Sequence, residues 1–265
     1  MNTIQLSIEE LIFSFYSEGL YEQGISIKET YFPTLQDSEL KLMLEFASRS
    51  LLAKEMIMEI DHQYKIKQEF SSFIHTLHYA DRTVKASKFN PNLDGEESIS
   101  FHLKNGEVFL HKLLHDHQVH YISKIQEEEI LLNITKFFTI NHLDKSSELL
   151  FKLKNEELED LLEDVSQSGS LPESVVQKWV SKTKNSTSLV QFLEDISIRN
   201  GKMDSLLSLK YDSENNPELI DLYFFIPGKT ECWLVTRDQN LDLNVQKANE
   251  SSIKNLLLND KVHSV

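Results

Sequence analysis

One stretch of strand-forming sequence, residues 98–138, constrains the fold most strongly because its pattern occurs twice in the chain. Ile99, Phe101 and Leu103 alternate with polar residues, as in a strand that buries one face. Asn105-Gly106 favours a type I′ hairpin turn, since both of its central residues need positive φ. The segment therefore predicts a three-stranded meander, followed by a helix over QEEEILLNITKFF.

A similar order returns at residues 203–259. We expect strands at 204–211, 219–226 and 230–237, a further strand that carries Leu241, Leu243 and Val245, and a helix at 250–259. Each meander follows a helix, at about 64–80 and 188–198. The pattern predicts an α+β fold of two pseudo-repeated helix–antiparallel meander–helix halves, with their sheets side by side about a pseudo-twofold axis.

The boundaries follow from this repetition. We expect a single domain over residues 1–265, with pseudo-repeats at about 38–139 and 187–260 and a helical middle at about 144–185. The middle helix is expected to open at Asp144 or Ser146, to carry the leucines from Leu149 onward, and to end at Gly169. The run 181–188 is the clearest internal break.

The N-terminal region gives further helix signals. Ser7 and Glu10 have the spacing of a capping box, for a helix that ends before Gly19. An irregular stretch that contains Pro33 is expected next, followed by a helix from Asp37 or Ser38. Residues 56–60 fit either a strand or a helix, and residues 83–89 alternate as a strand.

Charge and cysteine content limit the classes of function. With 42 acidic against 27 basic residues, the formal net charge is −15, which disfavours nucleic acid and anionic membranes as partners. The single cysteine, Cys232, excludes an internal disulfide and argues against a Cys-based zinc site. The first apolar stretch, LIFSFY, follows two glutamates and lacks the basic n-region of a signal peptide. No apolar run reaches the ~20 residues of a membrane span. We therefore expect a cytoplasmic protein without membrane insertion.

Two groups of side chains resemble catalytic or metal-binding sets. The first is a histidine cluster, His102, His111, His115, His117 and His120, which could hold a transition metal but has no cysteine or carboxylate pattern to complete it. We favour histidines on the solvent face of a meander, and expect neither a metal nor a cofactor. Cys232 beside Trp233 could be a nucleophile, but a buried core cysteine fits the strand spacing better.

Two other groups could contact a partner protein. An acidic cluster includes Glu156, Glu159, Asp160 and Glu163, and the interleaved leucines favour the solvated face of an amphipathic helix that could also be an electrostatic docking surface. Tyr223, Phe225 and Trp233 lie on paired strands. They are either buried against the middle helices or exposed as a binding surface.

Three segments carry a resemblance to a known family: LEFASRSLLAKEMI, ESISFHLKNGEVFLHKL with the following QEEEILLNITKFF, and ELIDLYFFIPGKTECWLVT with ESSIKNLLL. In the order and architecture of these segments the chain resembles the EspG chaperones of ESX (type VII) secretion and the EsaE-like accessory proteins. The resemblance implies a cytosolic, non-enzymatic chaperone that holds a helical-hairpin secretion substrate, of LXG or WXG type, in an export-competent state.

Two other classes of function stay open. An immunity or antitoxin protein that neutralises a co-expressed toxin is also acidic and lacks catalytic motifs. A hydrolase could use the histidine cluster, in which case His115 and His117 would matter for activity. The sequence leaves a homodimer open.

Overall fold

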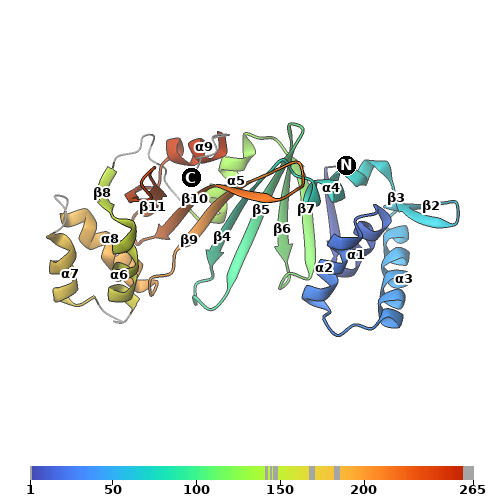
Figure 1. Cartoon of the computed structure of the whole chain (residues 1–265), viewed down its shortest axis with the longest axis horizontal. Coiled ribbons are helices and arrows are strands. Elements are labelled where there is room, and N and C mark those ends of the chain that lie inside the picture. Colours follow the sequence, from blue (N-terminus) through green and yellow to red (C-terminus); the bar gives the residue numbers. More distant parts are fainter. Residues whose placement is uncertain are drawn as a thin grey trace. The chain divides into compact units, whose positions relative to one another are not determined.

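The computed structural model describes residues 2–140, 143, 145, 149–166, 171–181 and 186–258. These residues form two compact units (Figure 1). The first unit consists of Met1–Thr83, Ile99–Glu127 and Ser213–Asn215, and the second of Val84–Ser98, Glu128–Asp212 and Asn216–Val265. None of the helices in the described residues is long and apolar enough to cross a membrane.

The first unit packs helices on an antiparallel sheet. Its elements are β1 (Thr3–Ser7), α1 (Ile8–Ser17), α2 (Tyr21–Tyr31), α3 (Asp37–Ala53), β2 (Ile57–Ile60), β3 (Gln63–Ile66), α4 (Gln68–His78), β5 (Glu96–Lys104, of which the first three residues belong to the second unit), β6 (Glu107–Leu114) and β7 (Val119–Ile125). The strand order is β1-β7-β6-β5, and β2 and β3 form a separate hairpin. Ile4, Phe15, Phe73, Phe109 and Ile122 are among the buried residues of its core.

The second unit has a larger sheet and its own core. Its elements are β4 (Arg82–Phe89, of which the first two residues belong to the first unit), α5 (Glu129–Phe137), β8 (Leu149–Leu153), α6 (Asn155–Ser166), α7 (Glu173–Val180), α8 (Ser186–Ile198), β9 (Asp204–Tyr211), β10 (Pro217–Pro227), β11 (Cys232–Arg237), β12 (Leu243–Lys247) and α9 (Glu250–Leu258). The strand order is β4-β9-β10-β11-β12-β8. Trp179, Phe192 and Trp233 are among the largest side chains of its core.

The chain order confirms the α+β class and the repeated plan. A helix, four strands and a helix follow one another as α4-β4-β5-β6-β7-α5, and again as α8-β9-β10-β11-β12-α9. Both Asn105 and Gly106 have positive φ, at 51° and 76°, as the hairpin requires. The domain boundaries, and the placement of the two sheets about a pseudo-twofold axis, stay predictions.

Three local predictions need correction, and one strand was not predicted. Residues 21–31 are helical, not irregular, and Leu149, Leu150 and Leu153 lie on strand β8, not on a helix. The helix expected over 64–80 begins only at Gln68, because the preceding residues pair with β2. Strand β1, which was not predicted, pairs with β7. The expected helix start at Asp144 or Ser146 and its end at Gly169 lie outside the described residues.

Candidate partner-binding surfaces

Three of the five histidines lie on the helix-covered face of the first unit's sheet, so the solvent-face prediction is wrong for them. His102 is on β5, His111 on β6 and His120 on β7, and the strand register places all three on the face of Phe109, which packs against Phe73 of α4. His115 and His117 are exposed in the β6–β7 turn. The fold therefore separates the five residues into a histidine row, in which His120 is buried and His102 and His111 are half-buried, and an exposed pair.

The histidine row is a chain of ring contacts. The His111 and His120 rings stack with centroids 5.1 Å apart, and His111 Nε2 lies 2.9 Å from His120 Nδ1, so that one nitrogen donates to the other. His102 contacts the hydroxyls of Thr83 and Ser100. Within the described residues, His120 Nε2 is buried without a hydrogen-bond partner.

These surroundings favour neutral imidazoles. Burial lowers the pKa of His102 to about 4, and burial together with the nearby His117 lowers the pKa of His120 to about 4. Burial, with His102 and His120 as neighbours, brings the pKa of His111 well below its usual value. In the described residues, no group of three or more His, Cys, Asp or Glu side chains is arranged to hold a metal ion.

Cys232 lies at the start of β11 and is half-buried. Burial raises the pKa of its thiol to about 12. The group is therefore a thiol at neutral pH, and since the thiolate is the nucleophilic form, this environment does not activate it.

The three candidate aromatics are buried in the second unit, but Phe225 and Trp233 contact residues outside the expected middle helices of 144–185. Tyr223 is 7% exposed, and Phe225 and Trp233 are fully buried. Phe225 stacks on Phe138 with ring centroids 4.5 Å apart, and the Trp233 indole donates to Asp195 of α8 over 2.8 Å. Direct contact of these residues with a partner would require them to leave the core.

The acidic cluster lies on α6 as expected. Glu156, Glu159, Asp160 and Glu163 are exposed, while Leu161 and Val165 of the same helix are buried. Asp164 anchors α6 to α7, because its Oδ2 accepts from Lys178 Nζ over 2.6 Å and from Trp179 Nε1 over 2.9 Å. The exposed carboxylates are thus held on a fixed helix and form one negative face.

A shallow groove of about 580 Å³ lies between α7 and α8 in this unit. Val176, Val180 and Val190 supply its apolar surface, while its polar side chains include Gln191 and Glu194. Together with α6, which contacts α8, the two helices form a helical layer with an apolar depression and an acidic face.

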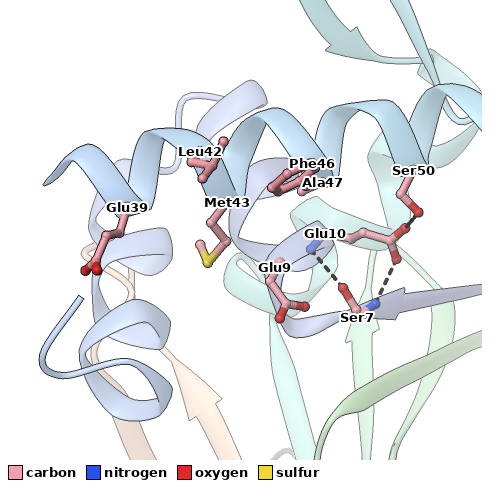
Figure 2. Close-up of a pocket in the computed structure, with 9 residues that line it drawn as sticks. All are labelled: Ser7, Glu9, Glu10, Glu39, Leu42, Met43, Phe46, Ala47 and Ser50. Atoms are coloured by element: carbon pink, nitrogen blue, oxygen red, sulfur yellow. Dashed lines mark hydrogen bonds between the residues drawn. The ribbon is translucent and has the colours of Figure 1, made fainter. Parts of the chain in front are cut away.

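A second groove, of about 430 Å³, lies in the first unit between α3 and the start of α1 (Figure 2). Leu42 and Phe46 of α3 are 52% and 57% exposed there, and neither was singled out from the sequence. The sequence signal that could have indicated this groove is the pair Leu42 and Phe46, two large apolar residues at i, i+4 spacing among polar neighbours.

Comparison with known proteins places the chain in a family. The family model described as "Uncharacterised protein YfjC" matches residues 3–257. The chain belongs to the YfjC family. A YfjC relative from Bacillus subtilis (strain 168) is 38% identical over 258 residues, which cover 97% of this chain and 99% of the relative.

The chain also has the fold of a solved chaperone. It superposes on the structure titled as the Mycobacterium tuberculosis type VII secretion system chaperone EspG5 in complex with a PE25-PPE41 dimer, with a TM-score of 0.64. The match covers 96% of this chain and 94% of the other at 8% identity. At this identity the likeness shows a shared EspG-like fold, in agreement with the fold class expected from sequence.

Proposed function

We propose that this protein is a cytosolic, non-enzymatic accessory chaperone that binds a helical substrate of a type VII secretion system. The observation that supports this proposal most strongly is the EspG-like fold over almost the whole chain. The solved structure compared above, which shares this fold, is that of a type VII secretion system chaperone in complex with a PE25-PPE41 dimer. The buried, neutral histidines and the unactivated Cys232 support binding over catalysis.

The helical layer of the second unit is the client surface in this proposal. A helical hairpin needs a partly apolar receiver for its exposed apolar residues, and the α7–α8 groove offers Val176, Val180 and Val190. The acidic face of α6, with Glu156 and Glu159, would attract a basic client and raise its rate of association.

Co-expression tests the proposal. The chain is produced together with a helical-hairpin secretion substrate encoded beside it, and the soluble client and the complex are quantified by size-exclusion chromatography. We expect the client to be soluble and to elute with the chain. A client that is equally soluble alone, and that elutes separately, would contradict the proposal.

An immunity function is the second candidate, favoured by the same acidic, exposed α6 face. It predicts that the chain abolishes the toxic activity of a co-expressed partner in an activity assay, whereas a chaperone leaves the folded partner's activity unchanged.

A further inference from the structure

The α1–α3 groove exposes large apolar side chains at one place. Leu42 and Phe46 are separated by one helical turn and are both more than half exposed, while Met43 and Ala47 lie deeper between them and α1 (Figure 2). Single exposed apolar residues are ordinary on a protein surface, but neighbours that line a common groove are typical of interaction sites.

The rim of this groove is acidic. Glu9, Glu10 and Glu39 line it, and its lining contains no lysine or arginine. Lys54 neutralises Glu10, with its Nζ 2.6 Å from Glu10 Oε2. Arg49 lies over the Phe46 ring, 5.6 Å from its centroid, and is balanced by Glu45 at 3.9 Å, so the net negative charge comes from Glu9 and Glu39. The groove therefore combines an apolar floor with a negative rim.

The groove is preformed. Glu10 Oε2 accepts from the Ser7 backbone over 2.8 Å, and Glu10 Oε1 accepts from Ser50 Oγ over 2.7 Å, so a single side chain ties the start of α1 to α3 (Figure 2). Helix α3 has 17 residues, about 25 Å at 1.5 Å per residue, which is long enough to lie along a partner helix of four turns. A preformed site loses less conformational entropy on binding.

We propose that this groove binds a basic amphipathic helix of a partner protein, with an apolar stripe on Leu42 and Phe46 and lysines or arginines beside Glu9 and Glu39. Charge selects this occupant over a second copy of the chain, because two such grooves would bring like charges together on a protein of net charge −15. The surface lies in the first unit and does not depend on the proposed client surface of α6–α8.

The test uses the full chain labelled with [methyl-¹³C]methionine, because Met43 lines the groove and Met203 lies in the second unit. The probe is a synthetic peptide of about 18 residues, with leucines at helical spacing and lysines on the other face. We expect saturable movement of the Met43 methyl resonance and none of the Met203 resonance. A glutamate version of the peptide, and a scrambled lysine version without an apolar stripe, should leave Met43 unmoved.

Substitutions in the chain provide a second test of the proposal. Leu42→Ser with Phe46→Ser, and separately Glu9→Lys with Glu39→Lys, should each weaken peptide binding at least tenfold. Matched controls are Leu132→Ser, 51% exposed on α5, and Glu29→Lys with Glu69→Lys, exposed elsewhere in the first unit; each should change binding less than twofold.

Three results would each overturn the proposal. They are equal shifts of Met43 with all three peptides, shifts of Met203 as large as those of Met43, and groove variants that bind the peptide as well as the unmodified chain does. Movement of Met43 with protein concentration alone would also overturn it, in favour of self-association. The Met43 measurement needs no substitution, so it decides the question even if a variant does not fold.

Discussion

At the scale of single residues, Asp195 of α8 shows how one buried side chain fixes a turn. Its Oδ2 accepts from the Trp233 indole over 2.8 Å and its Oδ1 accepts from the Lys229 backbone over 3.2 Å. The carboxylate reaches these donors because Gly228 has no side chain: a Cβ there would lie 2.1 Å from Asp195 Oδ2. The expected strands at 219–226 and 230–237 leave residues 227–229 as the turn between them, but local sequence does not indicate the carboxylate that closes over this turn.

Gly228→Ala should therefore lower the free energy of unfolding by about 2 kcal/mol or more, since buried overpacking costs about 1–3 kcal/mol and a displaced Asp195 also loses its hydrogen bonds. Urea unfolding measures the change. The control is Gly95→Ala, whose Cβ would meet the mobile end of the Asn90 side chain at 3.1 Å and should cost under about 1 kcal/mol. Equal costs for the two variants would contradict this account of the turn.

The histidine row of His102, His111 and His120 should make stability depend on pH. Burial lowers the folded pKa of His102 and of His120 to about 4, against about 6.5 in an unfolded chain, so the unfolded state binds more protons between these values. The free energy of unfolding is therefore highest above pH 6.5 and decreases as the pH falls toward 4, by on the order of 3 kcal/mol for each histidine.

Replacing one member of the row should weaken this dependence. His120→Leu should reduce the fall in unfolding free energy between pH 6.5 and pH 4, as measured by urea unfolding at each pH. The control Leu132→Ser, at an exposed position with no titratable group, should leave the fall unchanged. Identical pH profiles for His120→Leu and the unmodified chain would show that the row does not titrate in this window.

At the scale of elements, helices and turns with a strong local sequence pattern were predicted correctly, and elements with a weak pattern were not. Ser7 and Glu10 form the predicted capping box, and the Asn105-Gly106 hairpin has the expected backbone. Helix α2 was missed because it buries only Gly24, which lies against Tyr16, and so has no apolar periodicity. Strand β8 was taken for a helix because a short apolar run fits both, and pairing with β12 decides between them.

The capping box gives a prediction for α1. Ser7→Ala removes the acceptor for the Glu10 backbone N–H and should lower the unfolding free energy by about 1 kcal/mol, the usual cost of losing an N-cap. Thermal unfolding followed by circular dichroism measures it. Ser38→Ala, at an exposed position inside the first turn of α3, is the matched control and should change stability by less than about 0.5 kcal/mol.

At the scale of the whole molecule, sequence indicated the acidic α6 face and the α+β class but not the two grooves. Grooves arise where helices distant in sequence pack, as α3 does on the start of α1, and no local pattern specifies that packing. Sequence left the aromatics Tyr223, Phe225 and Trp233 undecided, because strand alternation alone does not show which face another element covers.

The acidic face of α6 should matter for client binding. Glu156→Lys with Glu159→Lys should weaken the affinity for a basic helical client at least tenfold at low salt, and the loss should shrink as added salt screens the charges. Isothermal titration calorimetry at two salt concentrations measures both effects. Glu29→Lys with Glu69→Lys makes the same change in net charge elsewhere and should change the affinity little, whereas an equal loss would assign the effect to net charge alone.

The central claim, that the protein holds a secretion substrate, is tested most directly by affinity purification of the tagged full chain from a cell that produces it and a type VII system, with quantitative mass spectrometry. The account predicts that a small helical secreted protein co-purifies in near-equimolar amount, and that Glu156→Lys with Glu159→Lys reduces its recovery while Glu29→Lys with Glu69→Lys does not. Recovery of the chain alone, or of a toxin whose activity it blocks, would contradict the account.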